Sequence, residues 1–381
     1  MINIFIKFYN FRFHNWLDNK MEKAGLSIDM TDTVVRCKNK LKANPAIGLV
    51  LVAIIAVVIL LTVDYATVIR IDGVRYRIDS TELTLSDIAL TNSDMRSLNR
   101  MRNLTYLILH NCEISDISAL KSLTNLEALS LANNPFSDIS ALGGLINLEG
   151  LVLINNQISD ISALGALENL EVLYLEENPI SDISVLASMT NLEYLSLSRN
   201  QISDISALGS LINLEILELE KNQISDICIL KNLANANLRY IGLENNQISD
   251  ISTLNSMINL NHLKLNANQI SDISALRSLT NLEYLDLSAN QISDISALES
   301  LTNLKHLVLR ANQISDISVM KDLTNLEYLD MNANKINDIS ALLNMVHLES
   351  VFLRDNQISI EQEEELRTAL PRLTNFSGNP S

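Results

Sequence analysis

Cysteine is scarce in this chain, with three residues among 381. Cys37 precedes a long apolar run, whereas Cys112 and Cys228 follow it and are separated by about five units of a repeat. At about 4.8 Å between neighbouring strands, that separation is roughly 25 Å, too far for a disulfide bond. The cysteines also lack the spacing of a zinc or redox site. The sequence therefore predicts neither a disulfide framework nor a metal site.

Glycine and histidine are also sparse, with 10 and 5 residues. The glycines form no phosphate-cradling run, and His110, His262, His306 and His347 are scattered along the chain. Neither G-x-S-x-G nor H-E-x-x-H occurs. We therefore expect a protein that is not an enzyme and that needs no cofactor.

Positive charge is deficient outside the first part of the chain. The whole chain carries −17, but residues 1–45 hold 8 basic and 4 acidic side chains, which leaves −21 for residues 46–381. Nucleic acids and anionic membrane surfaces attract lysine and arginine. The acidic part is thus expected to bind neither, and a cationic partner would be attracted to it.

What the chain has in abundance is a periodic asparagine. The interval between successive copies is 22 residues, with a single step of 24. A period of this length indicates a small supersecondary unit stacked many times, each copy burying its apolar face against its neighbours. The asparagine column consists of Asn134, Asn156, Asn178, Asn200, Asn222, Asn246, Asn268, Asn290, Asn312, Asn334 and Asn356.

The repeated unit is typified by residues 282–298, LEYLDLSANQISDISAL. It fits L-x-x-L-x-L-x-x-N-x-I followed by S-D-I-S-x-L, the leucine-rich repeat pattern. Its three leading leucines are expected to point inward around a short strand, while Ile295 and Leu298 close the unit on the convex side. The predicted fold is an α/β leucine-rich repeat solenoid: a curved parallel β-sheet with short 3-10 or helical turns on the convex side.

The unit resembles the 22-residue repeat of bacterial internalins, and less closely that of the eukaryotic leucine-rich regulatory subunit of protein phosphatase 1. The resemblance covers roughly residues 80–381 and implies a protein-binding role such as adhesion. The chain departs from internalins because it lacks their L-P-x-T-G wall anchor and an immunoglobulin-like module after the repeats. Host-cell invasion is therefore not implied.

Two polar columns have structural interpretations. A buried asparagine at the end of each strand must be satisfied by backbone groups, so the asparagine column is expected to join neighbouring units. Aspartates recur within the S-D-I-S segments, where a serine or aspartate is expected to cap the convex turn. A column of calcium ligands is the alternative, but the glycine-rich nonapeptide of calcium-binding β-rolls is absent.

The run Ala46–Val63 contains no charged side chain and is long enough to span a bilayer. Cations precede it, which places residues 1–45 in the cytoplasm and the repeats outside the cell. The expected domains are a cytoplasmic segment (1–45), a transmembrane helix (46–63), a juxtamembrane β-hairpin (64–79) and the capped repeat domain (80–381). A cleaved signal peptide is the alternative, although the run is too long and no A-x-A-like site follows. Met21 is an alternative translation start.

The concave sheet face is the predicted binding surface for a protein or peptide. Tyrosine offers rigid contact area with a polar tip, whereas the alternative is that these rings only suit strands and pair across them.

Paired acids such as Glu176 with Glu177, and Glu218 with Glu220, are expected to be solvated, with nothing to shift their pKa values. The predicted function is a membrane-anchored adhesin or receptor-like protein, and the alternative is a scaffold or regulatory subunit of an envelope complex. The predicted contact residues are Tyr106, Val152, Tyr174, Tyr194, Tyr240, His262, Tyr284, His306, Tyr328 and Phe352.

Overall fold

The computed structural model describes residues 68–234 and 236–378, which belong to one compact unit. In these residues no helix combines the length and apolar character needed to cross a bilayer. The expected cytoplasmic segment (1–45) and transmembrane helix (46–63) lie outside the described residues, so both stay predictions.

A β-hairpin opens the described part of the chain. Strands β1 (Val68–Ile71) and β2 (Val74–Arg77) pair antiparallel. Asp72 and Gly73 join them with φ of 48° and 75°, the left-handed pair that a tight two-residue hairpin turn requires. Helix α3 (Asn92–Leu98) then replaces the usual turn in the first repeat and starts at a capping box formed by Thr91 and Asp94.

A single parallel sheet dominates the repeat domain. Within the described residues it has 14 strands, each paired with the strand of the next repeat. Its strands are β3 (Glu82–Ser86), β4 (Tyr106–His110), β5 (Ala128–Ser130), β6 (Gly150–Val152), β7 (Val172–Tyr174), β8 (Tyr194–Ser196), β9 (Ile216–Glu218), β10 (Tyr240–Gly242), β11 (His262–Lys264), β12 (Tyr284–Asp286), β13 (His306–Val308), β14 (Tyr328–Asp330), β15 (Ser350–Phe352) and β16 (Asn375–Ser377).

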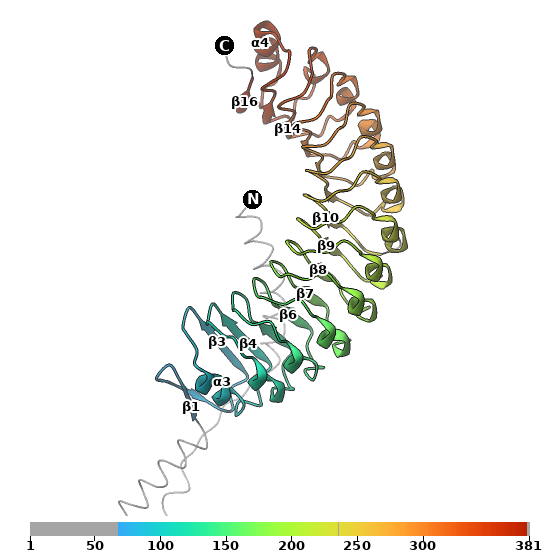
Figure 1. The fold of residues 1–381 in the computed structure, drawn as a ribbon. Coiled ribbons are helices and arrows are strands. Elements are labelled where there is room, and N and C mark those ends of the chain that lie inside the picture. Colours follow the sequence, from blue (N-terminus) through green and yellow to red (C-terminus); the bar gives the residue numbers. More distant parts are fainter. Residues whose placement is uncertain (1–67, 235, 379–381) are drawn as a thin grey trace, which may run out of the picture. The chain divides into compact units, whose positions relative to one another are not determined.

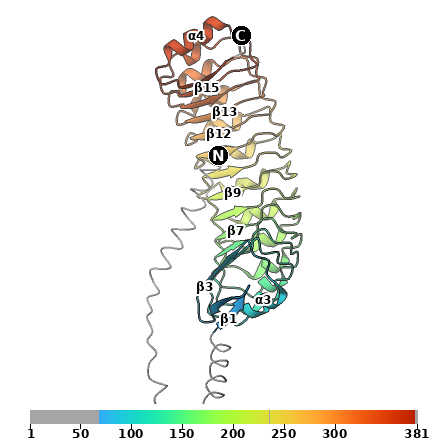
Figure 2. The ribbon, with the colours of Figure 1, turned by 90° about the vertical axis from the view of Figure 1, so that its left-hand side faces the viewer.

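Short 3-10 helices lie behind the sheet, one after each strand from β4 to β14. Within this unit the stack curves, with the sheet on the inner side and the 3-10 helices on the outer side (Figures 1 and 2). The predicted solenoid is therefore confirmed. The helices are η2 (Ser118–Ser122), η3 (Ser140–Leu142), η4 (Ser162–Ala166), η5 (Ser184–Ser188), η6 (Ser206–Ser210), η7 (Cys228–Leu233), η8 (Ser252–Ser256), η9 (Ser274–Ser278), η10 (Ser296–Ser300), η11 (Ser318–Asp322) and η12 (Ser340–Leu342).

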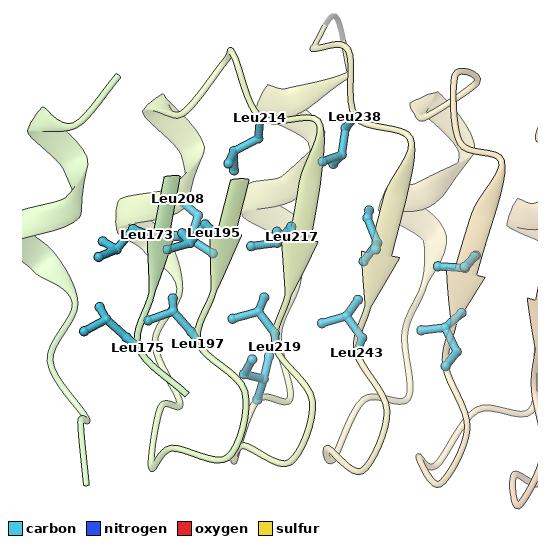
Figure 3. Close-up of a cluster of buried hydrophobic side chains, with 14 of the residues drawn as sticks. Leu173, Leu175, Leu195, Leu197, Leu208, Leu214, Leu217, Leu219, Leu238 and Leu243 are labelled. Atoms are coloured by element: carbon cyan, nitrogen blue, oxygen red, sulfur yellow. The ribbon is translucent and has the colours of Figure 1, made fainter. Parts of the chain in front are cut away.

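The core is a leucine and isoleucine column between the sheet and the 3-10 helices. In the typical unit, Leu282, Leu285, Leu287 and Leu298 have no exposed surface, and Ile295 is 1% exposed. Figure 3 shows the same positions in neighbouring repeats, where Leu195, Leu217 and their equivalents stack in rows. Each unit contributes one layer of apolar side chains, and this layer is buried by the layer of the next unit. No unit therefore has a core of its own.

The asparagine column joins neighbouring repeats by hydrogen bonds. Asn246 Nδ2 donates to the backbone carbonyls of Leu219 (2.9 Å) and Leu243 (3.1 Å), which belong to different repeats. Its Oδ1 accepts from the backbone N–H of Ile224 at 3.0 Å. The other asparagines of the column repeat this pattern, as at Asn290. The side chain therefore satisfies backbone groups that the sheet does not reach.

A second asparagine column, which the sequence reasoning missed, lies before each strand. Asn281 Nδ2 donates to the carbonyl of Ile258 at 2.8 Å, and Asn303 Nδ2 donates to that of Thr280 at 2.9 Å. The signal was the asparagine of the recurring T-N-L-E segment. Both columns are structural and leave the sheet face free for other residues.

The recurring aspartates bind the first backbone N–H of each 3-10 helix, as expected of a capping group, from the residue before the N-cap isoleucine. Asp272 Oδ1 accepts from the backbone N–H of Ser274 at 2.8 Å, and the equivalent bond occurs in all units from Asp116 to Asp338. This N–H lowers the pKa of Asp272. Each such carboxylate already serves a backbone donor, which favours capping over the calcium interpretation.

The last repeat ends in an α-helix instead of a 3-10 helix. Helix α4 (Ile360–Ala369) starts at a capping box formed by Ser359 and Gln362. The chain then returns as β16 and pairs with β15, so the final core layer is covered. Leu366 and Leu370 of this segment are buried.

The concave face of the sheet as a candidate binding site

Two rows of side chains stand on the inner face of the sheet. Each three-residue strand from β5 to β15 buries its middle leucine, isoleucine or valine, so the residues on either side of it point to the opposite face. The strand register aligns these positions across the sheet: Tyr240 lies beside His262, and His262 lies beside Tyr284. The spacing of the repeat therefore translates directly into two straight rows.

The first row carries a run of stacked rings from β10 to β14, and Phe352 of the second row adds a ring on β15. Neighbouring centroids lie 5.4 to 6.2 Å apart. The planes of His262 and Tyr284 differ by 8°. His306 is exposed and the other rings are partly exposed. We call this set the aromatic stripe; its members are Tyr240, His262, Tyr284, His306, Tyr328 and Phe352.

The remaining predicted contact residues do not join this stripe. Tyr174 and Tyr194 form a separate pair with centroids 4.5 Å apart. Tyr106 lies on β4, and Ala128 and Gly150 occupy the next two places in its row. The structure thus divides the predicted set into the stripe, one pair and one distant tyrosine.

Val152 must be removed from the predicted contact set. It is 3% exposed, although its position in the second row is the predicted one. Its short side chain lies between Ser130 and Tyr174 in the row. Because the longer ring beside it reaches further from the sheet, Val152 lies below the accessible surface.

The expectation of solvated acids is wrong for Glu176 and Glu218, and Glu244 on the same face is buried as well. Burial raises the pKa of Glu176 to about 8 and that of Glu244 to about 7, and it also raises the pKa of Glu218. Tyr194 donates a hydrogen bond to Glu218 at 3.1 Å. Long side chains on adjacent strands exclude water from these carboxyl groups, and the loss of solvation disfavours their charged form. The curved sheet face is therefore less open than the sequence suggested.

Glu177 and Glu220 behave differently from their buried neighbours. Glu177 lies 3.3 Å from Arg199, and Glu220 lies 3.3 Å from Lys221. Their side chains are partly exposed, so these ion pairs are worth at most about 1 kcal/mol each.

A glycine interrupts the second row beside the acids. Gly242 of β10 lies between Glu218 of β9 and Lys264 of β11. A β-carbon at this position would lie 3.0 Å from Glu244 Oε2 and 3.4 Å from Tyr240 Cε1. The side chains of Glu244 and Tyr240 therefore occupy the space that a side chain at position 242 would take. Sequence reasoning missed this arrangement, although a glycine in a row of larger residues was the available signal.

Comparison with known proteins agrees with this architecture. The family described as Leucine Rich repeats (2 copies) matches residues 102–144, 146–188, 190–233, 236–278, 258–300, 280–321 and 302–344. No curated protein sequence matches the chain significantly.

Solved structures with the same fold include two from Listeria monocytogenes. An internalin (InlF) has 34% identity and a TM-score of 0.70, and the match covers 81% of this chain and 86% of that one. The functional domain of InlJ has 21% identity and a TM-score of 0.66, with 78% and 63% covered. A leucine-rich repeat protein of Leptospira interrogans has 22% identity and a TM-score of 0.55, with 79% and 96% covered.

Proposed function

The chain belongs to the internalin-type leucine-rich repeat proteins, and from that premise we propose that it is a non-enzymatic binding protein whose concave sheet face holds another protein or a peptide. We further propose that residues 46–63 anchor it in the cell membrane, with residues 1–45 in the cytoplasm and the repeats outside. In this arrangement it acts as an adhesin or receptor-like protein.

The observation that carries the proposal is the aromatic stripe. Cross-strand pairing accounts for the alignment of its rings, but pairing alone does not require rings that remain partly exposed over six strands. Large rigid side chains with polar tips are enriched at protein interfaces. Since the repeats hold these rings in place, a partner meets a preformed surface and little ordering free energy is lost on binding.

The stripe is tested by replacing Tyr240, Tyr284 and Tyr328 with alanine in the full-length chain. We expect the triple variant to keep the circular dichroism spectrum of the repeats and to lose most of its partner binding. A folded triple variant that retains full binding would contradict the proposal. The matched control replaces Thr280, Thr302 and Thr324, which are exposed outside the sheet face, with alanine.

A second candidate function is a scaffold or regulatory subunit of a cell-envelope complex, in which the concave face would hold another protein of the envelope. Crosslinking on intact cells distinguishes the two: partners from the cell's own envelope exclude adhesion, and partners from a host cell alone exclude the subunit role. Protease added to intact cells tests the orientation, because repeats that survive it would not be outside.

A further inference from the structure

The β1–β2 hairpin carries positive charge in an otherwise acidic molecule. Residues 46–102 have no net charge, because six arginines balance six acids, so the whole −21 belongs to residues 103–381. Three of these arginines, Arg70, Arg75 and Arg77, lie in the hairpin. The average acidity of residues 46–381 thus does not describe this end of the repeat domain.

The strand pairing places these three arginines on one face of the hairpin. In the antiparallel register Arg70 lies opposite Arg75, and Val68 lies opposite Arg77. Side chains of directly opposed residues, and of residues two apart on one strand, point to the same side. All three arginines are exposed. We call Arg70, Arg75 and Arg77 the arginine face.

The other face of the hairpin is apolar and packs against the first repeat. Ile69 and Ile71 are 2% and 1% exposed, and Tyr76 packs against the same core. Strand β1 also contacts helix α3. The hairpin lies at the end of the stack, beyond β3 (Figures 1 and 2). Because its apolar face is turned toward the repeats, the arginine face is turned away from their acidic surface.

The chemistry of the arginine face suits phosphate groups. Like charges that face each other across two strands are destabilising, and an anion over Arg70 and Arg75 reduces their repulsion. The guanidinium fork also matches the geometry of a phosphate. Arg77 binds Asp79 through Nε at 2.9 Å and Nη2 at 2.6 Å. Since a guanidinium group has five N–H donors, an arginine with one partner can still bind a phosphate oxygen.

The length of the intervening chain limits how far the hairpin lies from the proposed anchor. The apolar run ends at Val63, and β1 begins five residues later at Val68. Five fully extended residues span at most about 17 Å, of which the lipid headgroup layer takes roughly 6 Å. The remaining distance is close to the Debye length of about 8–10 Å, so the arginines act on charges at the membrane surface.

We propose that the arginine face binds the phosphate headgroups of anionic phospholipids on the outer side of the membrane. The proposal rests on the proposed anchor at residues 46–63 and adds a second contact with the same bilayer. An anchor alone leaves the repeat domain free to tilt about its linker. A second contact at the end of the stack limits this tilt and so restricts the directions from which a partner reaches the concave face.

The test uses the full-length chain in nanodiscs of phosphatidylcholine, with or without about 30% phosphatidylglycerol. Hydrogen exchange with mass spectrometry compares the amides of residues 68–79 with those of residues 262–286 in the middle of the stack. We expect the anionic lipid to slow exchange in the hairpin about tenfold or more and to leave residues 262–286 unchanged. A third sample, neutral discs with soluble glycerol phosphate, distinguishes the lipid from a free phosphate.

Three triple variants separate the arginine face from the charge of the rest of the chain. The first removes the face: Arg70→Gln, Arg75→Gln and Arg77→Gln. The control removes the same charge from exposed positions on the repeats: Arg277→Gln, Arg310→Gln and Arg354→Gln. The third keeps the charge of the face: Arg70→Lys, Arg75→Lys and Arg77→Lys. We expect the first variant to lose the lipid effect and the other two to keep it.

Four results would overturn the proposal. They are equal hairpin exchange in neutral and anionic discs, a lipid effect that survives the glutamine variant of the face, a lipid effect that the control variant loses equally, and slowing by soluble glycerol phosphate as strong as that by the lipid. If the glutamine variant of the face already exchanges fully in neutral discs, its hairpin is unfolded and the lysine variant decides. Loss of the lipid effect in that variant also overturns the proposal.

The experiment separates the arginine face from the anchor. Co-elution of the full-length chain with neutral discs in size-exclusion chromatography tests whether residues 46–63 hold it in the bilayer. A chain that does not co-elute removes the anchor and, with it, the second contact. A chain that co-elutes but shows no lipid effect on the hairpin removes the second contact and leaves the anchor standing.

Discussion

Replacing Glu176 with glutamine should stabilise the repeat domain at neutral pH and have little effect in acid. Burial raises the pKa of this carboxyl from 4.5 to about 8, because the low-dielectric surroundings disfavour its charged form. Glutamine has nearly the same shape and is neutral at every pH. The substitution thus removes the ionisation while keeping the packing.

The magnitude follows from the difference in proton binding between the two states. Below pH 4.5 both folded and unfolded chains hold the proton, so glutamate costs nothing relative to glutamine. Between pH 4.5 and 8 the unfolded chain ionises and the folded one does not, so stability falls as the pH rises. At about 1.4 kcal/mol per pH unit, the wild type loses about 3 kcal/mol by pH 7 relative to the variant.

Urea unfolding followed by circular dichroism at pH 4.5, 6 and 7.5 measures this difference. We expect the gap between Glu176→Gln and wild type to widen with each step in pH. A gap that stays constant across these pH values would refute the reasoning. Glu177→Gln is the control: its partly exposed side chain pairs with Arg199, so its loss should cost less than about 1 kcal/mol.

Three further predictions concern the stability of the repeat stack. Asn246→Ala leaves the Ile224 N–H and three carbonyls without the side chain that binds them and should cost about 1–3 kcal/mol in urea unfolding. Ala289→Asn should gain about 0.5–1 kcal/mol in the same assay, since φ of 53° suits asparagine better than alanine. The backbone N–H of Ser274 lowers the pKa of Asp272, so the contribution of this carboxylate is present above pH 3.8 and is lost as the pH falls below it; the urea midpoint should fall there, and less in Asp272→Asn.

The architecture was predictable because each of its causes is local and repeated. A leucine such as Leu285 and an asparagine such as Asn290 occupy the same environment in every unit. The 22-residue period therefore predicts both the strand and the asparagine column. The capping role of Asp272 was predictable for the same reason. The register also follows from the period, since equal units place equal residues side by side.

The environment of the site was less predictable because it depends on residues that break the period. Whether Glu176 is solvated depends on the side chains of the adjacent strands, and a pattern within one unit contains no such information. Val152 was misjudged for that reason as well: its position was right, but its neighbour determines its exposure. The surroundings of Gly242 are set by Glu218 and Lys264, which lie beside it on adjacent strands.

The central claim is that a partner binds the concave face along the aromatic stripe. It is tested most directly by placing a photo-crosslinking amino acid, p-benzoylphenylalanine, at Tyr284 on the stripe and, in a second variant, at Arg277 on the exposed side of η9. After irradiation of intact cells, the account predicts a crosslinked partner from position 284 and none from position 277. A partner captured from position 277 alone, or equally from both positions, would contradict it.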